Sequence, residues 1–597
     1  MSQSTLALIR EFMKSNGLAA YIVPSSDPHQ SEYVPEYLRR RAYVSGFTGS
    51  AGDLVITTKA AGLWTDSRYY LQAETQLQGT GIELFKAGLP ETPQMSTHLV
   101  AALTEGDSVG VDPMLFSQKA YASLSRRLSN AGITLCSIEK NPVDAVWPHR
   151  PAPPAGPVVP YPERYTGESL SARLERVRQE MRRLGAEVLP VTTLDALAWV
   201  FNIRGSDVQY NPVVIGYGVI ESDRAVLFVD AKKMTAETTR HLSENVDILD
   251  YSRFGPYLEN IAKRGTQVLV DADTLSRWAF ERLQGKCTLV LHRSPITALK
   301  ARKNDVEIEG IIRAHIRDGV AVTRFLAWLD KATQSETVTE ISAAQKLEEF
   351  RCAETNYKGP SFGTISAFGA HGAIVHYEAD ESTDARIEAP GLYLVDSGGQ
   401  YLDGTTDITR TVALGTPTDE MKDRFTRVLK GNLNLAVMSF PVGTTGSSLD
   451  TVARKPLWDI GLNYGHGTGH GVGAYLNVHE GPQAISYYRG MDVPLAVGMV
   501  VSDEPGYYKE GAYGIRIENL VYVVSDEELS KGGSPFLRFE ILTLCPIDRR
   551  LILPELLCDS ELAFLNAYHR RVLETLAPLL DDADREWLKQ AAAEISR

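Results

Sequence analysis

Cysteine is scarce in this sequence, which has five cysteines among 597 residues and no CxxC pair. Because these thiols lie far apart in the chain, the sequence gives no support for a disulfide framework or for a zinc site built from thiolates. Such cysteine usage is typical of a reducing compartment, so we predict a cytoplasmic location. The cysteines are Cys136, Cys287, Cys352, Cys545 and Cys558.

Long hydrophobic runs are also missing. No stretch approaches the roughly 18 apolar residues that a membrane-spanning helix needs. The opening segment, MSQSTLALIREFMKSNG, lacks the basic region followed by an uninterrupted apolar region that marks a secretory signal. We therefore predict a protein that is neither embedded in a membrane nor secreted.

Basic residues are in deficit, with 61 Lys and Arg against 75 Asp and Glu and a formal net charge of −14. Such a charge repels a phosphate backbone and an anionic membrane surface, so we predict no nucleic-acid and no membrane partner. The composition is otherwise that of a globular protein, with 43% hydrophobic and 23% charged residues. A chain of 597 residues is too long for one core, which predicts two to four domains.

Two segments, near residues 1–70 and 169–232, repeat the order helix, glycine, strand, turn, strand. In each, apolar residues recur at helical spacing, a glycine (Gly17 or Gly185) follows the last turn, and an apolar strand comes next. The repeat predicts two similar α/β domains. The helical apolar positions are Leu6, Ile9 and Met13 in the first segment and Leu170, Leu174, Val177, Met181 and Leu184 in the second.

A proline-rich stretch separates the two repeats. Residues 148–162, PHRPAPPAGPVVPYP, contain seven prolines in fifteen positions, so neither a helix nor a central strand can form there. A third domain begins after SPITALKARKND, where isoleucines at helical spacing follow a cap at Asn304 or Asp305. We predict domain boundaries that give 1–155, 156–298 and 299–597.

Within the third domain, a capping box from Thr337 to Glu340 is predicted ahead of the helix ISAAQKLEEF. Strands punctuated by glycines follow this helix, and an amphipathic segment from about 560 to 596 closes the domain. The chain as a whole therefore predicts a mixed α/β (α+β) fold.

Histidine is concentrated in one part of the third domain, since five of the twelve fall between residues 371 and 479. The most informative stretch is YGHGTGHGVGAYLNVHE, in which glycines alternate around His466 and His470 and disfavour a helix. In an extended chain the two imidazoles share one face, and the glycines leave the other open to close backbone approach. The stretch predicts two imidazoles in one cavity, with an exposed glycine-rich loop as the alternative.

Four carboxylates stand at or near apolar segments. Asp396 ends one such strand and Asp407 follows eleven residues later, with turn signals between them, so a hairpin-like return would bring both together. For each aspartate, an Asx turn or a helix cap is the alternative. Glu504 follows another apolar strand. Glu518 lies inside the apolar run GIRIENLVYV, where a carboxylate needs a cation as partner.

These carboxylates and one histidine make up the ligand set of a site for two divalent metal ions. Structural zinc favours Cys and His ligands, whereas an oxygen-rich set suits Mn²⁺, with Fe²⁺, Co²⁺ or Zn²⁺ also compatible. Two ions about 3.5 to 4 Å apart can share a bridging hydroxide and clamp both the entering and the leaving group of a hydrolysis. The predicted ligands are Asp396, Asp407, His470, Glu504 and Glu518.

The order Asp, eleven positions, Asp, HGTGHGVG, DEPG and GIRIEN resembles the pita-bread metallopeptidases. Within that family the whole sequence is most similar to the long, three-domain cytosolic form of the Xaa-Pro aminopeptidase (aminopeptidase P) group. The resemblance implies a C-terminal pita-bread catalytic domain preceded by two creatinase-N-like α/β domains. It also implies a homodimeric enzyme that releases the first residue from peptides with proline in second position, through a hydroxide that bridges two metal ions.

The resemblance assigns a role to each predicted ligand. Asp396 would chelate one metal ion, and His470 with Glu504 would bind the other. Asp407 and Glu518 would bridge the two ions. His470 would also belong to the substrate-binding residues, and Glu504 would steer a proton from the bridging water to the leaving nitrogen.

Three further histidines and two arginines gain roles from the same resemblance. His376 in GAHGAIVHY and His479 in LNVHE would contact the substrate and stabilise the tetrahedral intermediate. His466 would line the catalytic pocket. Arg68 in WTDSRYY is similar to an arginine that binds substrate from a neighbouring domain or subunit, with a surface arginine as the alternative. Arg516 would orient the carboxylates.

Three other functions stay open from the sequence. A prolidase would accept only Xaa-Pro dipeptides, although two N-terminal modules favour the aminopeptidase P group. A non-catalytic pita-bread module would bind a peptide or a histone, but it would have no reason to hold four carboxylates that repel one another without a cation. Creatine hydrolysis on the same fold runs without metal, and the carboxylates count against it.

Overall fold

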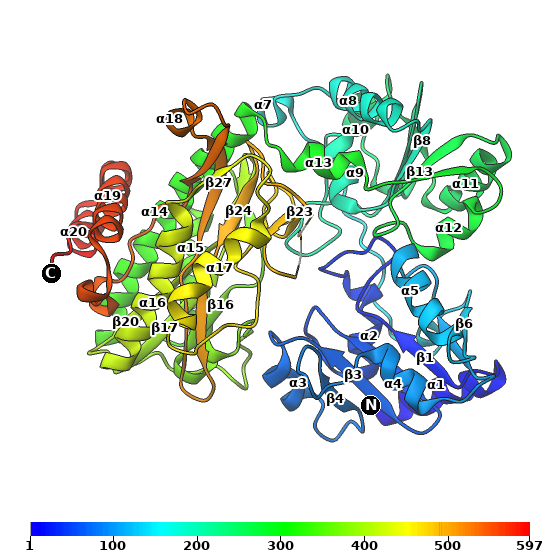
Figure 1. The fold of residues 1–597 in the computed structure, drawn as a ribbon, viewed down its shortest axis with the longest axis horizontal. Coiled ribbons are helices and arrows are strands. Elements are labelled where there is room, and N and C mark those ends of the chain that lie inside the picture. The colour runs from blue at the N-terminus through cyan, green and yellow to red at the C-terminus, as the bar shows by residue number, and fades with distance from the viewer. Residues whose placement is uncertain (1, 489, 491) are drawn as a thin grey trace. The chain divides into compact units, whose positions relative to one another are not determined.

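The computed structural model describes residues 2–488, 490 and 492–597 (Figure 1). The chain folds as two compact units. One unit consists of Met1–Glu163 with Glu168–Thr297, and it contains both sequence repeats. The other consists of Arg164–Gly167 with Ala298–Arg597, and it contains every predicted metal ligand.

The first unit begins with a six-stranded mixed sheet of order β4-β3-β2-β1-β5-β6. The pairs β1–β2 and β2–β3 are antiparallel, whereas β1–β5, β3–β4 and β5–β6 are parallel. Helix α1, Ser2–Ser15, buries Leu6, Ile9 and Met13 against it, as the helical period requires. The other elements are β1 Ala20–Val23, α2 Arg40–Ser45, β2 Asp53–Thr57, β3 Ala61–Thr65, α3 Tyr70–Gln76, β4 Glu83–Lys86, α4 Met95–Ala102, β5 Ser108–Val111, α5 Gln118–Ser129, β6 Thr134–Ser137 and α6 Pro142–Ala145.

A second sheet in the same unit has the order β12-β11-β10-β8-β13-β14. Its strand directions repeat those of the first sheet pair by pair, with β8 in the place of β1. The predicted repeat is therefore confirmed as two domains of one topology. Its elements are α8 Leu170–Arg183, β8 Val188–Val191, α9 Leu194–Val200, β10 Tyr217–Glu221, β11 Ala225–Phe228, α10 Ala236–Leu242, β12 Asp247–Leu249, α11 Phe254–Lys263, β13 Gln267–Val270, α12 Arg277–Leu283 and β14 Thr288–Leu291.

The proline-rich stretch between the two repeats contributes the two-residue strand β7, Val159–Pro160, which pairs with β9, Ile203–Arg204. Each proline there removes a backbone donor, so the segment forms a short edge pairing instead of a central strand. In the part of the chain that the structure describes, no helix combines the length and the apolar character needed to cross a membrane.

The second unit contains the 31-residue helix α14, Asp305–Ser335. Of the two predicted caps the structure selects Asn304, whose side chain accepts the Glu307 N–H while Glu307 accepts the Asn304 N–H. This reciprocal cap fixes the start of the unit's longest helix. The other helices are α13 Pro295–Ala301, α15 Glu340–Cys352, α16 Asp419–Ala436, α17 Gly446–Trp458, α18 Glu527–Ser530, α19 Asp559–Leu576 and α20 Asp582–Ala591, with the short α7, Glu163–Thr166, ahead of them.

The second unit's predicted ligands lie in antiparallel strands or directly beside their ends. One sheet has the order β16-β17-β20 and another the order β21-β28-β27-β24-β22-β23, while β25 and β26 form a separate hairpin. Helices α14 to α17 lie along the strands (Figure 1), and Phe325 and Leu326 of α14 pack with Tyr393 of β17. The strands are β15 Tyr357–Pro360, β16 Ile365–Phe368, β17 Gly391–Ser397, β18 Gly399–Tyr401, β19 Gly404–Thr405, β20 Ile408–Leu414, β21 Ser439–Pro441, β22 Gly469–Gly471, β23 Glu480–Ile485, β24 Val500–Asp503, β25 Gly506–Lys509, β26 Tyr513–Arg516, β27 Asn519–Ser525 and β28 Phe536–Ile541.

The predicted capping box of α15 is wrong. The residues that exchange side-chain and backbone hydrogen bonds are Thr339 and Ser342, two positions further along than Thr337 and Glu340. Glu340 is the first helical residue, and its side chain turns into the protein interior instead of back to the cap. A sequence pattern cannot distinguish these two caps, because both place an acceptor at the helix start.

The prediction that Glu518 lies inside one continuous strand is wrong. It occupies the break between β26 and β27, which belong to different sheets, so the chain must leave one hydrogen-bonded ladder before it enters the next. His466 likewise precedes β22, and only the GHG around His470 forms a strand.

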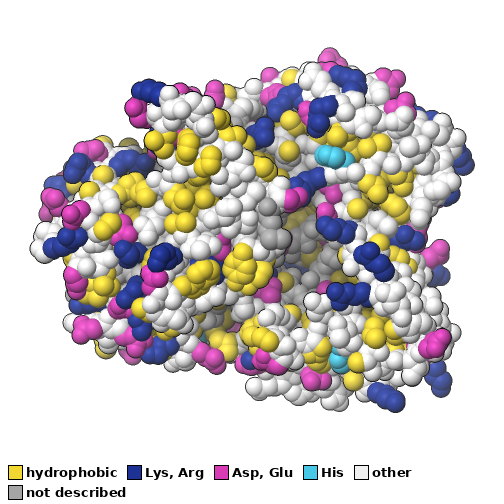
Figure 2. Space-filling view, viewed as in Figure 1, with side chains coloured by type: hydrophobic (Ala, Val, Ile, Leu, Met, Phe, Trp, Pro, Cys, Tyr) yellow, Lys and Arg dark blue, Asp and Glu magenta, His cyan; other side chains and the backbone are white. Residues whose placement is uncertain are grey.

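Surface charge is mixed on the face drawn in Figure 2. Acidic and basic side chains are interspersed there, and hydrophobic side chains occur in separate groups among them. The excess of negative charge, −14 for the chain, is therefore not gathered into a single acidic patch on this face.

Candidate metal centre

Two of the predicted ligands are brought together by the pairing of β17 with β20. The two strands are antiparallel, and the register places Asp396 opposite Thr409. Asp407 comes directly before β20, so it lies at the same end of the ladder as Asp396. The hairpin-like return that was predicted from the eleven-residue spacing is present in the structure.

Three ligands from distant parts of the chain meet at one point. Single ligand atoms of Asp407, His470 and Glu518 all lie within 4.8 Å of one another. His470 Nε2 lies 3.5 Å from Asp407 Oδ2 and 3.5 Å from Glu504 Oε1, so Glu504 joins the same cluster. Together with Asp396, these groups form a cluster of four carboxylates and one imidazole, which we call the metal centre.

Glycines allow His470 to enter this cluster. Strand β22 is hydrogen-bonded between β23 and β24. A Cβ atom at Gly469 would collide with the Ser502 carbonyl oxygen, and one at Gly471 would collide with that of Glu480. The glycines that flank His470 are therefore required by close backbone approach, which agrees with the interpretation of the alternating pattern.

The orientation of the His470 ring suits a metal ligand. Its Nδ1 lies 3.0 Å from the Gly471 carbonyl oxygen, which can only accept a hydrogen bond, so Nδ1 carries the proton. In the neutral ring the lone pair is then on Nε2, the atom that faces Asp407 and Glu504. A backbone acceptor on the far ring nitrogen is the usual way in which a protein fixes a metal-binding histidine.

Electrostatics indicate an excess of negative charge at the metal centre. Burial raises the pKa of Asp407 well above its usual range, and the negative charges of Asp396 and Glu504 raise it further. Burial also raises the pKa of Glu518 well above its usual range, with Asp407 and Glu504 adding to the shift. Carboxylates held this close in a buried site cannot all be ionised unless cations lie between them.

The donor set fits divalent metal ions. The Asp396 Oδ1 atom is buried and has no hydrogen-bond partner among the described residues, although the second oxygen of the same carboxylate is paired. An unpaired buried oxygen beside three further carboxylates and a histidine lone pair matches the hard, oxygen-rich coordination that Mn²⁺ and similar ions take.

Arg516 contacts one predicted ligand directly and a second through Thr409. Its Nη2 donates to Asp396 Oδ2 at 2.6 Å, and its Nε donates to Thr409 Oγ1 at 3.2 Å. Thr409 Oγ1 in turn donates to Glu518 Oε2 at 2.8 Å. These contacts are those expected of an arginine whose role is to orient carboxylate ligands.

The sequence analysis missed Tyr508 and Thr409. The Tyr508 hydroxyl accepts from Arg516 Nη1 at 2.7 Å and lies 2.8 Å from His466 Nε2, so it connects that histidine to the arginine. Burial raises the pKa of Tyr508 to about 12, which keeps the hydroxyl protonated. The sequence gives only that residues 506 and 508 share one face of a strand, and the pairing of Gly506 with Arg516 that brings Tyr508 near the arginine is visible only in the structure.

The predicted histidines lie in different parts of the second unit's site region. The His479 ring packs edge-on against the His470 ring, with centroids 4.3 Å apart, so it borders the metal centre. His466 contacts Tyr508, and His376 follows Val375, whose carbonyl accepts from Arg516 Nη2 at 3.4 Å. Arg516 thus connects both histidine segments to Asp396.

Arg68 lies outside the unit that contains this cluster. It belongs to the first unit, where Nε and Nη2 donate to the two oxygens of Asp66 at 2.8 and 2.7 Å. This bidentate pair orients the guanidinium, and 15% of the Arg68 side chain stays exposed.

Antiparallel sheets backed by helices, together with a buried cluster of four carboxylates and one histidine, define a metal-dependent hydrolase of the pita-bread type. Family models agree with this class. The model of metallopeptidase family M24 matches residues 309–525, and that of the C-terminal region of peptidase M24 matches 535–595. Models of the creatinase/prolidase N-terminal domain match residues 6–145 and 149–307. The chain belongs to metallopeptidase family M24.

Relatives extend the similarity over the full chain. The chain is 42% identical to the Xaa-Pro aminopeptidase ApepP of Drosophila melanogaster, with 99% of each chain covered. It is 41% identical to aminopeptidase P2 of Arabidopsis thaliana, covering 96% of this chain and 85% of that protein. These similarities confirm the predicted membership of the Xaa-Pro aminopeptidase group.

Among solved structures, the X-prolyl aminopeptidase of Caenorhabditis elegans superposes with a TM-score of 0.96 at 36% identity, and 100% of both chains is covered. That protein is described as a cytosolic enzyme with a di-nuclear active site. The Xaa-Pro dipeptidase of Bacillus anthracis matches 64% of this chain at 24% identity with a TM-score of 0.52, which supports the fold alone. The predicted fold class, a pita-bread domain after two creatinase-type domains, is confirmed.

Proposed function

We propose that this chain is an aminopeptidase that removes the first residue from peptides whose second residue is proline. The observation that carries the proposal is the convergence of Asp407, His470 and Glu518 in a chain that matches Xaa-Pro aminopeptidases over its full length. An Xaa-Pro bond is a tertiary amide without an N–H, so proteases that bind extended strands handle it poorly and a dedicated site is needed.

The metal centre would hold two divalent ions. Asp396 would bind one ion, His470 and Glu504 the other, and Asp407 with Glu518 would bridge them. Mn²⁺ is the ion we propose, because four of the five ligands are carboxylates and none is a thiolate. When bound, such ions polarise a carbonyl oxygen and lower the pKa of water, which supplies a nucleophile near neutral pH.

The chain's own residues would transfer the proton and stabilise the developing negative charge. Burial raises the pKa of Glu504, with His470 and Arg516 opposing the shift, so this carboxyl is suited to take a proton from the attacking water and pass it to the leaving nitrogen. His376 and His479 would donate hydrogen bonds to the substrate carbonyl oxygen as it becomes an oxyanion. His466, held by Tyr508, would line the pocket.

The resemblance of the sequence supports the assembly, the location and the domain bounds that we propose, and the Caenorhabditis elegans neighbour is described as a cytosolic enzyme. We propose a cytoplasmic homodimer with domains at 1–155, 156–298 and 299–597. Within it, Arg68 would contact the substrate, since its guanidinium is already oriented by Asp66. His470 would also border the bound peptide, next to His479.

A peptide panel tests the proposed function. Protein purified without chelator is assayed on an Xaa-Pro dipeptide, an Xaa-Pro-Xaa tripeptide and an Xaa-Ala-Xaa tripeptide, with and without added Mn²⁺. We expect release of the first residue from the Xaa-Pro-Xaa peptide and dependence on the metal. Turnover of dipeptides alone would identify a prolidase. Less than one equivalent of metal, with no response to Mn²⁺, would identify a non-catalytic binding module.

A further inference from the structure

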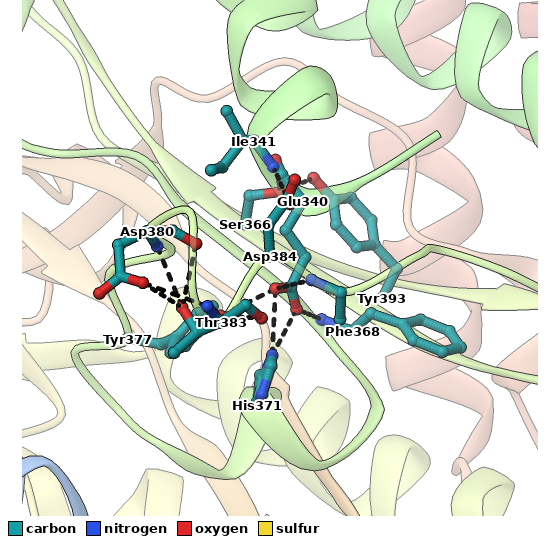
Figure 3. A network of polar contacts seen from close by, with 11 residues as sticks. Glu340, Ile341, Ser366, Phe368, His371, Tyr377, Asp380, Thr383, Asp384 and Tyr393 are labelled. Atoms are coloured by element: carbon teal, nitrogen blue, oxygen red, sulfur yellow. Dashed lines mark hydrogen bonds and ion pairs between the residues drawn. The ribbon is translucent and has the colours of Figure 1, made fainter. Parts of the chain in front are cut away.

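Glu340 is a buried carboxylate outside the metal centre that holds one segment of the chain. It is the first residue of α15, and its exposed fraction is 0%. Oε1 accepts from the Phe368 N–H at 2.6 Å and lies 2.9 Å from His371 Nδ1. Oε2 accepts from the Tyr377 hydroxyl at 2.8 Å and from the Ala385 N–H at 3.0 Å. Figure 3 shows Phe368, His371 and Tyr377 gathered around the Glu340 carboxylate.

The four donors enclose the segment that carries His376. Phe368 and His371 precede this histidine, and Tyr377 and Ala385 follow it. The His371 and Tyr377 rings stack with centroids 4.5 Å apart, so the residues on both sides of His376 are also in contact with each other. We call residues 368–385 the His376 segment.

The backbone of α15 completes this anchor. The Glu340 N–H donates to the Ala385 carbonyl at 3.0 Å, and the Glu340 carbonyl accepts from the Ser366 hydroxyl at 2.7 Å. Asp384 accepts the next helical N–H, that of Ile341, at 2.9 Å. Both ends of the His376 segment are therefore tied to the first turn of one helix.

The opposite side of the His376 segment packs on β26. Gly372 and Gly514 approach so closely that a Cβ atom at Gly514 would collide with the Gly372 carbonyl. Two residues further along β26, Arg516 donates to the Val375 carbonyl at 3.4 Å and to Asp396 at 2.6 Å. The His376 segment thus lies between Glu340 and the arginine that orients a metal ligand.

Glu340 has a costly environment for a carboxylate. The donors that contact its two oxygens are two backbone N–H groups, a hydroxyl and one imidazole, and none of them carries a permanent charge. Hydrogen bonds and the positive end of the α15 dipole stabilise the buried charge. Glu340 raises the pKa of His371 through its hydrogen bond, so the imidazole is more readily protonated beside it. One carboxylate therefore accepts from four donors of the His376 segment.

We infer that Glu340 is a positioning residue for the peptidase reaction: with His371 and Tyr377 it fixes the His376 segment, so that His376 meets the substrate at the metal centre. The inference rests on the proposed function. In this arrangement His371 acts as a structural partner of Glu340. A misplacement of about 1 Å in a reacting group can cost on the order of 100-fold in rate, so a positioning residue has a measurable effect.

The variant Glu340→Gln tests the inference. A glutamine has one acceptor oxygen, so its amide NH₂ must face either the Phe368 N–H or the Ala385 N–H and leave that donor unpaired. We expect kcat on an Xaa-Pro-Xaa peptide to fall by about 10- to 100-fold, with KM changed less than about threefold and the metal content unchanged. An unchanged kcat, or loss of bound metal, would overturn the inference.

A double variant separates positioning from general damage. If Glu340 acts through His376, then Glu340→Gln should reduce kcat by less than about twofold in a His376→Ala background. An equal loss in both backgrounds would show that Glu340 does not act through this histidine. Wild-type protein is assayed alongside to separate the proposed function from the inference about Glu340. An inactive wild type would contradict the proposed function. An active wild type with a fully active Glu340→Gln variant would contradict only the inference.

A matched control and a milder pair of variants complete the experiment. Glu348→Gln, also on α15, removes a carboxylate that accepts from the Tyr357 hydroxyl at 2.6 Å and lies outside the His376 segment; it should keep full activity. If Glu340→Gln fails to fold, Tyr377→Phe and His371→Gln each remove one contact. Each should lower kcat by about 2- to 10-fold, and again not in the His376→Ala background. Full activity of both would overturn the inference.

Discussion

Arg516 Nη2 lies 2.6 Å from Asp396 Oδ2, and the same guanidinium reaches the Thr409 and Tyr508 side chains. This buried guanidinium therefore contacts a predicted ligand, Asp396, and also Thr409, which bonds the predicted ligand Glu518. It also contacts Tyr508, which lies next to His466. A planar fork of donors can serve these acceptors at once, which an ammonium group cannot.

The first prediction concerns this arginine. Arg516→Lys should weaken metal binding by about 10- to 100-fold, because a lysine Nζ cannot hold Asp396, Thr409 and Tyr508 together. Titration of metal-free protein with Mn²⁺ against a competing chelator measures the change. Arg386→Lys is the control, since that side chain is 59% exposed. Equal Mn²⁺ affinity of the wild type and Arg516→Lys would show that Arg516 does not orient the metal ligands.

The second prediction compares metal-free with metal-loaded protein. In the metal-free state Asp407 is repelled by Asp396 and Glu504, so Asp407→Asn should raise the melting temperature by about 2–4 °C at pH 8. Saturating Mn²⁺ should reverse the order, because a ligand at 100 times its dissociation constant stabilises the wild type by about 2.7 kcal/mol. Activity of the variant should fall by at least about 100-fold.

The pH dependence of this comparison has a defined sign. The folded-state pKa of Asp407 is raised, so its contribution to stability is fully present below the unfolded pKa of about 4 and is lost as pH rises through the folded pKa. The advantage of metal-free Asp407→Asn should therefore be absent near pH 4 and grow toward pH 8. Asp459→Asn, at an exposed ion pair with Lys455, should show neither effect. Stabilities that keep the same order with and without Mn²⁺ would contradict a cation-dependent centre.

The third prediction concerns a buried group of three charges next to His479. Lys300 and Lys303 place their Nζ atoms 2.6 and 2.5 Å from the two oxygens of Glu480, and all three side chains are at most 3% exposed. Glu480→Gln removes the counter-charge that both ammonium groups share, so the free energy of unfolding should fall by about 3–5 kcal/mol. Urea denaturation measures this loss.

Two variants make that result specific. Glu528→Gln removes one member of an exposed pair with Lys531 and should cost less than about 1 kcal/mol. The triple variant Lys300→Met, Lys303→Met, Glu480→Gln leaves no buried charge and should recover at least half of the loss. A triple variant that is less stable than Glu480→Gln would show that the group is held by packing and not by charge.

The fourth prediction concerns His569 in α19. Burial, together with the charges of Arg410 and Arg549, lowers the pKa of His569 to about 4, and its Nε2 accepts from the Ile547 N–H at 3.1 Å. A base with a lowered folded pKa contributes stability that is complete above the unfolded pKa of about 6.5 and is lost as pH falls toward 4. The loss should be about 3 kcal/mol.

His569→Gln keeps an acceptor for Ile547 but does not titrate. The stability difference between wild type and this variant, taken from urea midpoints at several pH values between 7.5 and 4.5, should shift in favour of the variant as pH falls. His149→Gln, a substitution at an exposed histidine, is the control for the loss of one titrating histidine. Parallel curves for wild type and His569→Gln would contradict the prediction.

Local sequence patterns were sufficient to predict the secondary-structure elements and several residues of the site. Leu6, Ile9 and Met13 predicted the buried face of α1, because a helical period depends only on near neighbours. The glycines around His470 predicted close backbone approach, which β22 confirms. Asp396 and Asp407 could be paired because turn signals separate them by a short distance in the chain.

The same kind of pattern failed where two local solutions were equivalent. Thr337 and Thr339 both offer a hydroxyl cap ahead of α15, and the choice between them decides whether Glu340 faces the cap or the interior. The apolar run around Glu518 is equally consistent with one strand or with two strands in different sheets. In both places contacts with other elements decide, and neighbours in the sequence do not encode them.

The sequence by itself determined the repeated α/β domains, the helical and extended segments, and the residue types of an oxygen-rich metal site, because these depend on periodicity and on the chemistry of single side chains. Tertiary structure alone decided how the site is held. Thr409 reaches Glu518 across 109 positions, and Arg516 reaches Asp396 across 120. Such contacts arise from the packing of β20 against β26 and β27, so no local pattern can specify them.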